Sequence, residues 1–246
     1  PLDAAKAIAA LAVHDSSVDS LFDEPFKRTP LPVVAVPLTA GTGSEVTPYS
    51  VLTDRKRQTK RSLSDRSLFP KAAFLDARYT LSLSKDATIN TAVDALSHAI
   101  EGFLSRKSSE MSDMFALEAL RSFRGIIQNL SQNTLTLTER EQLLFASLLS
   151  GIVIAQTGTT MIHPLGYSLT YFRSIPHGCA NGLLLAESLR FMQAEASDKI
   201  TTILKTLDFT DLNALKTTMR LLVGAERPLT AEERPIFINK ALQAAN

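Results

Sequence analysis

Apolar residues recur at the three- and four-residue spacing of a helix through most of the chain after about residue 84, and strand-like alternation is rare there. The longest uncharged run, residues 143–162, approaches the length of a membrane span, but serines, threonines and glycines interrupt it. We therefore interpret this run as a buried helix that leads into a turn. The periodic segments predict helices over residues 87–104, 112–130, 139–155 and 179–193.

The residues before this region follow a different pattern. An alanine-rich stretch at 3–13 predicts a helix, and LPVVAV at 31–36 predicts a short strand of the kind buried on both faces of a parallel sheet. KAAFL at 71–75 is a weaker strand candidate. The segment TAGTGSE at 39–45 and the basic, serine-rich residues 55–66 are predicted to be loops.

This change of pattern marks a domain boundary near residues 84 and 85. Residues 1–84 are expected to form a partial dinucleotide-binding α/β domain, and residues 85–246 an all-α domain. The helical pattern is already under way at Pro1, without an initiator methionine, so we expect a segment to be missing upstream.

Composition and charge narrow the possible functions. A chain of 246 residues that is 45% hydrophobic and 21% charged is typical of a globular protein. A net charge of +1 does not favour nucleic acid or an anionic membrane surface as a partner, so a small molecule or a second copy of the chain is expected. The single cysteine, Cys179, makes no internal disulfide, and no signal peptide pattern is present; both features favour the cytoplasm.

Three of the four histidines lie in the helical region and are candidate metal ligands. Asp94 and His98 are four residues apart, so both project from one face of the predicted helix. His163 lies where an apolar helix gives way to a turn, and His177 lies in a turn that opens another helix. One carboxylate with imidazoles suits Fe²⁺ or Zn²⁺ better than Ca²⁺ or Mg²⁺. An ordinary helix-surface pair with two structural histidines remains the alternative, because ligands spread over some 80 residues form no local metal motif.

The predicted loop TAGTGSE combines two glycines with three hydroxyl side chains directly after a strand. Such a loop lets backbone and hydroxyl groups approach a phosphate or a ribose. A plain glycine and threonine turn without a ligand is the alternative.

Three segments, TAGTGSE, DALSHAIE (94–101) and IPHGCANGLLL (175–185), closely resemble the signature segments of the iron-dependent alcohol dehydrogenases, in the same order. The resemblance spans nearly the whole chain and implies a dehydroquinate synthase-like fold, with an N-terminally truncated nucleotide-binding domain. It also implies a homodimer that uses NAD or NADP on a small alcohol or aldehyde. The metal ligands that it implies are Asp94, His98, His163 and His177. Through the metal, these four are also the implied catalytic residues.

The same resemblance implies a set of cofactor-binding residues. They are Asp3, Thr39, Thr42, Ser44, Lys60 and Tyr79, with Arg61 as an alternative to Lys60 and with Thr80 and Leu81 beside Tyr79. Many family members carry a further histidine four residues after the second histidine ligand, whereas this chain has Tyr167 there. Phe103, Tyr171 and Phe172 either line an apolar substrate pocket or belong to the helix core.

The activity expected from the resemblance is reversible hydride transfer between a small primary alcohol and a nicotinamide cofactor. A glycerol or polyol dehydrogenase and dehydroquinate synthase share the scaffold and remain alternatives. A metal-binding fragment without turnover is a third possibility, because the family's glycine-rich phosphate loop belongs to the segment that we expect to be missing upstream.

Overall fold

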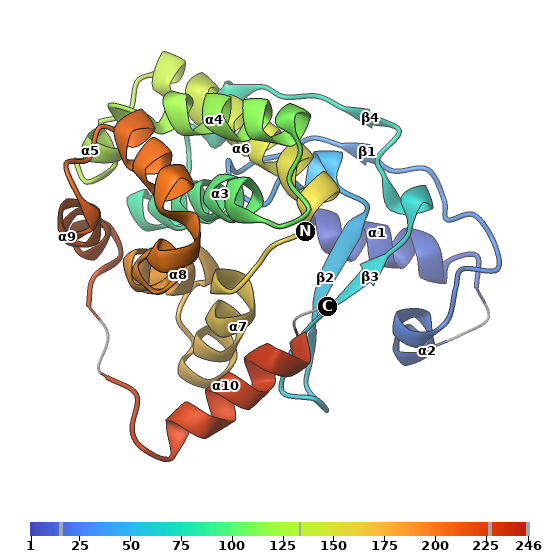
Figure 1. The fold of residues 1–246 in the computed structure, drawn as a ribbon. Helices are drawn as coiled ribbons and strands as arrows, with labels where there is room; N and C mark the ends of the chain where they lie inside the picture. The colour runs from blue at the N-terminus through green and yellow to red at the C-terminus, as the bar shows by residue number, and fades with distance from the viewer. Residues whose placement is uncertain (15–16, 133, 226–227, 245–246) are drawn as a thin grey trace.

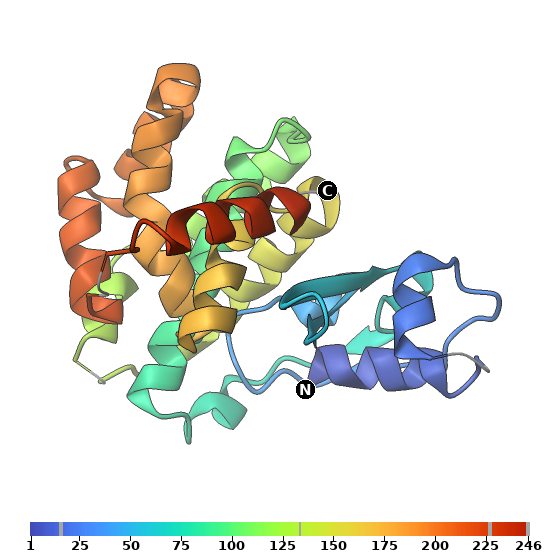
Figure 2. The same ribbon diagram turned by 90° about the horizontal axis from the view of Figure 1, so that it is seen from below.

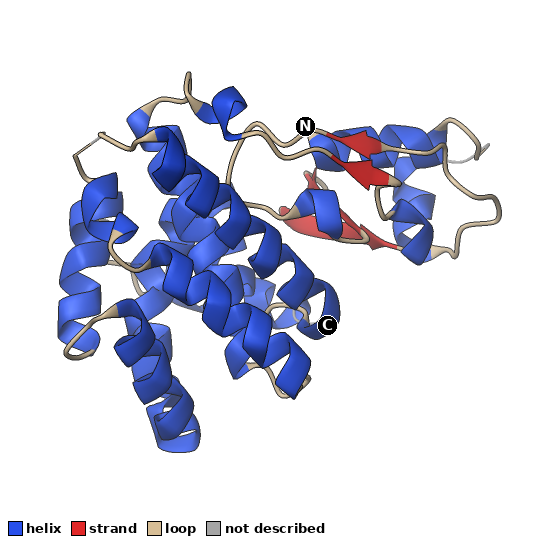
Figure 3. Cartoon of the chain, turned by 90° about the horizontal axis from the view of Figure 1, so that it is seen from above, coloured by secondary structure: helices blue, strands red, loops and turns tan. Residues whose placement is uncertain are grey.

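The computed structural model describes residues 1–14, 17–132, 134–225 and 228–244. The four strands and the first two helices gather on one side of the molecule, and the longer helices form a bundle beside them (Figures 1 to 3). An α/β part therefore precedes a helical part, as the sequence predicts. Its helices are α1 (Leu2–Leu11) and α2 (Val18–Asp23), and three 3-10 turns follow: η1 (Ser44–Val46), η2 (Arg66–Leu68) and η3 (Ala77–Thr80).

The strands form two separate pairs rather than one sheet. β1 (Val34–Ala35) is parallel to β4 (Ala72–Ala73), while β2 (Tyr49–Asp54) and β3 (Thr59–Ser64) form an antiparallel hairpin in which Tyr49 lies opposite Ser64. Both predicted strands are present, but each is only two residues long and so shorter than predicted. The first is the more affected. Prolines at positions 32 and 37 flank it, and proline has no amide proton to donate to a ladder. The expected burial on both faces is wrong as well, because Val34 is 58% exposed.

The predicted loop at 55–66 is wrong, since half of it forms β3. In the sequence, the charged residues of this segment resemble those of a solvated loop. In the structure they are paired across the hairpin and with α2. Arg61 contacts Asp54 across the hairpin at 3.7 Å, contacts Asp23 of α2 at 2.5 Å and lies over the Phe22 ring. Leu63, two residues further and on the same face of the strand, is buried in a small core with α1 and α2.

A buried lysine joins α1 to the segment that follows β1. Lys6 is fully buried, and its Nζ donates hydrogen bonds to the carbonyl oxygens of Ser44, Thr47 and Tyr49 at 2.6, 2.7 and 2.9 Å. An ammonium group has three protons to donate, so three carbonyls satisfy it. Lys6 thereby fixes the loop that carries TAGTGSE against the first helix.

Replacing Lys6 with methionine is expected to destabilise the fold, and the loss should grow with pH. Burial lowers the pKa of Lys6 from 10.5 to about 8, although the charges of Asp3 and Glu45 raise it in part. Between these two pKa values the unfolded chain holds more protons than the folded one, so the stability of the native protein rises with pH across that window. Unfolding free energies of the wild type and Lys6→Met should differ by roughly 2 kcal/mol more near pH 9.5 than near pH 7. A difference that stays constant or shrinks would contradict this account.

The helical part is built around α3 (Lys85–Leu104), which packs against α4 (Glu110–Phe123), α6 (Leu137–Thr157) and α8 (His177–Leu207). The side chain of Ser84 caps α3 by accepting a hydrogen bond from the Ala87 amide. A large apolar core fills the space between these helices. The shorter helices are α5 (Ile126–Leu130), α7 (Ile162–Arg173), α9 (Leu212–Val223) and α10 (Glu233–Ala244).

The predicted helices are confirmed, with two corrections. The helix predicted over 112–130 is divided into α4 and α5, because Gly125 adopts a φ of +79° that interrupts the helix. The helix predicted over 179–193 begins earlier, at His177, and extends to Leu207 past a non-helical residue at Ala196. The apolar run at 143–162 is a buried helix that ends at Thr157, as predicted. Among the described residues, no single helix is long and apolar enough to cross a membrane, and α6 with α7 passes that test only as a pair bent by 110°.

Candidate metal centre

Helix α3 brings three ionisable side chains into the middle of the bundle. Asp94, His98 and Glu101 lie four and three residues apart, so all three project from one face of the helix. Because α3 is surrounded by α4, α6 and α8, this face is buried, and so are all three side chains. Buried charged groups require partners, so this face has to meet complementary groups.

The partners come from the first turns of α7 and α8. His163 Nε2 lies 3.6 Å from Asp94 Oδ1, and the His163 ring stacks on the His98 ring with a centroid distance of 4.4 Å. One donor atom from each of Asp94, His98 and His163 lies within 4.8 Å of the others, a spacing that could hold a metal ion. His177 lies outside that closest group but adjoins it, with Nε2 at 3.7 Å from Asp94 Oδ1.

Glu101 fixes the orientation of His163. One carboxylate oxygen is bonded to His163 Nδ1, and the other accepts hydrogen bonds from the Thr160 amide, the Thr160 hydroxyl and the Ile162 amide at 2.8 to 2.9 Å. With Nδ1 held by a carboxylate, Nε2 is the nitrogen presented to Asp94. Carboxylates that bond the outer nitrogen of a histidine in this way are typical of metal centres.

The charges of the cluster shift the pKa values of its members in opposite directions. Burial alone would raise the pKa of Asp94, but His98 and the other two histidines hold it well below its usual range. Burial lowers the pKa of His98 to about 4 and that of His177 to about 3. For His163, burial is outweighed by Glu101 and Asp94, which raise its pKa to about 9. An anionic Asp94 with neutral His98 and His177 is the protonation state in which these groups bind a metal.

Two further observations support a cation at this position. Asn181 Nδ2 lies 3.1 Å from Asp94 Oδ1, 3.3 Å from His163 Nε2 and 3.4 Å from His177 Nε2, so one carboxylate oxygen and two ring nitrogens converge on one point. The buried Nδ1 of His98 has no hydrogen-bond partner in the described part of the chain. A carboxylate with imidazoles converging on one point fits Fe²⁺ or Zn²⁺.

The residue at the position of the family's further histidine lies beside this cluster. The Tyr167 ring stacks on His177 with a centroid distance of 5.1 Å and meets His163 edge to face. Burial, with the nearby carboxylates, raises the pKa of Tyr167 above its usual value. Its phenol therefore stays neutral and is suited to donate a hydrogen bond rather than to accept a proton.

Two of the expected cofactor residues are in contact with each other. Ser44 donates from its hydroxyl to Asp3 Oδ1 at 2.5 Å, and Asp3 Oδ2 accepts from the Val51 amide at 3.0 Å. Thr42 is exposed and accepts a hydrogen bond from the Ser44 amide, while Thr39 is half-buried. The segment TAGTGSE is thus held between α1 and the hairpin.

Lys60 and Tyr79 lie on different elements from that loop. Lys60 is on β3, close enough to His177 for its positive charge to lower the pKa of that histidine. Tyr79 and Leu81 are exposed at η3, whereas Thr80 is buried with its carbonyl oxygen bonded to Arg140. The hairpin therefore brings one of the expected cofactor residues towards the metal centre.

Of the aromatic candidates for a substrate pocket, Phe103 lies apart from the other two, whose rings meet edge to face at 5.1 Å. Phe103 is buried in the main helical core, under the Lys199 ammonium. Phe172 stacks on Phe237 of α10. Tyr171 donates to the carbonyl oxygen of Arg55 at 3.5 Å. For Phe103 the helix-core interpretation is confirmed.

The glycines of TAGTGSE have a packing role that the sequence did not reveal. A Cβ on Gly43 would lie 2.4 Å from the Cα of Gly151 in α6, and a Cβ on Gly41 would lie 2.7 Å from the Cβ of Thr91 in α3. Gly43 also has a φ of +59°, which disfavours other residues. These contacts press the loop directly onto α3, which carries Asp94 and His98, and onto α6, which packs against α3.

Replacing Gly43 with alanine is expected to destabilise the protein by about 2 to 4 kcal/mol, from overpacking together with the left-handed backbone. Gly151→Ala, at a position with helical φ, isolates the steric part and should cost about 1 to 3 kcal/mol. Chemical denaturation of both variants measures these costs. Values within about 0.5 kcal/mol of the wild type, the range of ordinary surface substitutions, would show that the contact between loop and helix is not tight.

Sequence reasoning missed Glu101 and Asn181. Glu101 was within reach, because it follows Asp94 and His98 at helical spacing in the segment DALSHAIE. Asn181 follows His177 by four residues on α8 in the same way. For both residues the helical period was the available signal.

Comparison with known proteins identifies relatives over the whole chain. The profile of the Fe-containing alcohol dehydrogenase family, C-terminal, matches residues 88–226, and that of iron-containing alcohol dehydrogenase matches residues 1–77. The 1,3-propanediol dehydrogenase of Citrobacter freundii is 33% identical over 78% of the chain and 50% of its own length. The NAD-dependent methanol dehydrogenase of Bacillus methanolicus is 28% identical over 94% of the chain and 60% of its own length.

Solved structures agree with these matches. An iron-containing alcohol dehydrogenase from Thermotoga maritima superimposes with a TM-score of 0.88 at 42% identity, over 99% of this chain and 66% of that one. A sulfoacetaldehyde reductase from Bifidobacterium kashiwanohense, in complex with NAD⁺, gives a TM-score of 0.84 at 29% identity, over 98% of this chain and 66% of that one. This chain thus spans 50% to 60% of the length of the curated relatives quoted and 66% of these two structures.

Proposed function

The chain belongs to the iron-containing alcohol dehydrogenase family, and we propose that it is the catalytic portion of a metal-dependent, NAD(P)-linked alcohol dehydrogenase. The proposed reaction is reversible hydride transfer between the carbinol carbon of a small primary alcohol and the nicotinamide ring, with the hydroxyl proton released to solvent. The observation that carries the proposal is the convergence of Asp94, His98 and His163 inside the helical core.

The proposed metal ligands are Asp94, His98, His163 and His177, and the proposed metal is Fe²⁺ or Zn²⁺. Support comes from the 4.8 Å grouping of the first three side chains and from the position of His177 Nε2 beside Asp94. A bound divalent metal supplies Lewis acidity at the substrate oxygen. The chain's own contribution is to hold the ligands at fixed positions and to keep the surrounding volume dry.

Several side chains have defined roles in this proposal. Glu101 holds His163 so that Nε2 faces the centre. Tyr167, stacked on His177, limits the ring rotation of that ligand, and its phenol stays neutral there. Lys60, from the hairpin, places a positive charge near His177 and is proposed to contact the cofactor.

For the cofactor we propose contacts from Asp3, Thr39, Thr42, Ser44 and Tyr79 in addition to Lys60. The hydrogen bond between Asp3 and Ser44 supports a shaped loop at this place, with the exposed Thr42 directed to solvent. The relatives include a NAD-dependent methanol dehydrogenase from Bacillus methanolicus and a NADPH-dependent butanol dehydrogenase from Clostridium saccharobutylicum. Either dinucleotide is therefore compatible with the family.

We further propose a boundary between residues 84 and 85, where α3 begins, and a cytoplasmic homodimer. Exposed apolar side chains on and beside β1, among them Leu31, Val34 and Val36, support a partner surface on the α/β part. Sedimentation of the purified chain measures its oligomeric state, and a monomer at all concentrations would contradict the dimer.

Activity is tested by reconstituting the purified chain with Fe²⁺ under anaerobic conditions and assaying methanol, 1-propanol and 1,3-propanediol with NAD⁺ and NADP⁺. Formation of reduced cofactor that requires both added metal and His163 supports the proposal. Metal binding without turnover, with every alcohol and both dinucleotides, would instead leave a non-catalytic metal-binding unit.

A further inference from the structure

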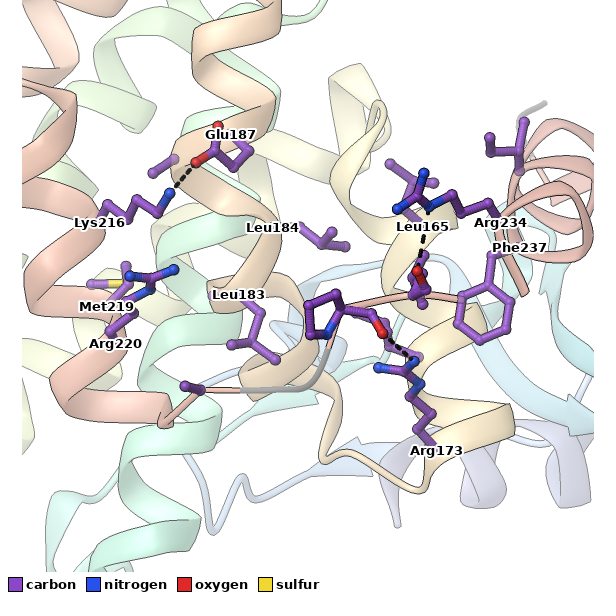
Figure 4. A pocket seen from close by; sticks show the side chains of 17 residues that line it. Leu165, Arg173, Leu183, Leu184, Glu187, Lys216, Met219, Arg220, Arg234 and Phe237 are labelled. Atoms are coloured by element: carbon purple, nitrogen blue, oxygen red, sulfur yellow. Dashed lines mark hydrogen bonds and ion pairs between the residues drawn. The ribbon is translucent and has the colours of Figure 1, made fainter. Parts of the chain in front are cut away.

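A cavity of about 310 Å³ lies between α7, α8, α9 and α10 (Figure 4). Its volume lies at the lower end of the range seen for small-molecule sites. At the roughly 30 Å³ that one water occupies in the liquid, it has room for a chain on the order of ten heavy atoms. The cavity is therefore large enough for a ligand and too large to be a packing defect.

The cavity is separate from the metal centre. On α7, Leu165 and Leu169 line the cavity, whereas His163 points to the metal cluster from about the opposite face of the helix. On α8, Gly182 and Ala186 line the cavity, whereas His177 and Asn181 face the cluster. A ligand in the cavity would thus be on the far side of two helices that carry metal-binding residues.

The wall of the cavity is mostly apolar. Leu169 and Phe237 belong to a buried apolar cluster that also includes Ala180, and Met219 is buried on the α9 side. Leu183 and Leu184 are half-buried and project from α8 towards this space (Figure 4). Such a wall favours an alkyl chain over a sugar or a nucleotide, whose hydroxyl and amide groups would find few partners there.

The charges at the rim select the polar end of the ligand. Lys216 is paired with Glu187, Arg173 donates to the carbonyl oxygen of Pro228, and Arg234 donates to the carbonyl oxygen of Leu229 (Figure 4). Arg173 is also paired with Glu233 of α10. Arg220, in the last turn of α9, has no hydrogen bond or ion pair with any described residue and is exposed. One uncommitted guanidinium beside an apolar cavity fits a single carboxylate, which it can bind through two parallel hydrogen bonds.

We propose that this cavity binds a medium-chain alkyl carboxylate, with the chain between α7, α8 and α10 and the carboxylate at Arg220. The proposal does not depend on the alcohol dehydrogenase activity, because neither metal nor dinucleotide contributes to the cavity.

The first test is a calorimetric titration of the full chain, without added metal or dinucleotide, with a series of linear carboxylates. We expect saturable binding at one site per chain, with affinity that rises roughly fourfold for each added methylene until the cavity is filled near decanoate. Decanol, which lacks the charge, should bind about tenfold more weakly than decanoate. No saturable binding of any carboxylate, or equal binding of decanol and decanoate, would overturn the proposal.

The second test locates the site with matched variants. Arg220→Gln should weaken decanoate binding about tenfold, whereas Arg106→Gln, at an exposed arginine outside the cavity, should leave it unchanged. Leu183→Trp should fill the space and weaken binding further, whereas Leu221→Trp, at an exposed position of α9, should not. Equal affinity in Arg220→Gln and the wild type would refute the assignment, and because Arg220 is exposed this variant is expected to fold.

Discussion

Replacing His163 with alanine is expected to lower the affinity of the chain for Zn²⁺ or Fe²⁺ by a hundredfold or more. His163 is buried, its Nε2 faces Asp94 and its Nδ1 is held by Glu101, so its removal takes away a proposed ligand and leaves two carboxylates without their partner. Loss of a residue that only hydrogen-bonds a metal ligand typically costs 10- to 100-fold in metal affinity, and loss of a direct ligand should cost at least as much.

Competition with a chelator of known affinity measures this effect. His14→Ala is the matched control, because His14 lies at the end of α1 and bonds the Ala10 carbonyl oxygen and the amides of Lys27 and Arg28. Metal affinity should be unchanged in that variant. If both variants bind metal as the wild type does, His163 is not a ligand.

Glu101→Gln is expected to weaken metal binding by about 10- to 100-fold although Glu101 is not itself a proposed ligand. The amide oxygen of glutamine can still accept from Thr160 and Ile162, but its NH₂ group then faces His163 Nδ1. To accept from that group, His163 has to carry its proton on Nε2, the nitrogen that faces Asp94. The substitution therefore changes the tautomer of a ligand while leaving the volume of the site almost unaltered.

Glu118→Gln is the matched control for Glu101→Gln. Glu118 is an exposed residue of α4 paired with Arg121, so its replacement should leave metal affinity unchanged. A merely structural role of Glu101 would lower the melting temperature of the metal-free chain without changing the dissociation constant of the metal. That pattern would exclude Glu101 as the residue that orients His163.

The helical half could be predicted from sequence because its candidate metal ligands and its apolar residues follow the same helical spacing. Asp94 and His98 are four residues apart in a segment with clear helical spacing, so the sequence places them on one face of α3. The convergence of His163 and His177 on that face depends on how α7 and α8 pack against α3, and no local pattern encodes that packing. The family resemblance supplied it instead.

The α/β half was harder to predict because its polar residues are paired in space rather than patterned in sequence. The positive charge of Arg61 favoured the prediction of a basic loop where β3 lies, although Asp54 and Asp23 match that charge in the structure. The glycines of TAGTGSE suggested an approach to phosphate, while the contact between Gly43 and Gly151 joins residues more than one hundred positions apart. Such long-range contacts leave no periodic signal.

The central claim is that the chain holds a divalent metal in the cluster around Asp94. Elemental analysis of protein purified without oxygen or chelators tests it most directly, in the wild type and in a variant with His163 and His177 both replaced by alanine. The account predicts roughly one Fe or Zn ion per chain in the wild type and little or none in the double variant. A wild type without metal after reconstitution, or equal metal content in the two proteins, would contradict it.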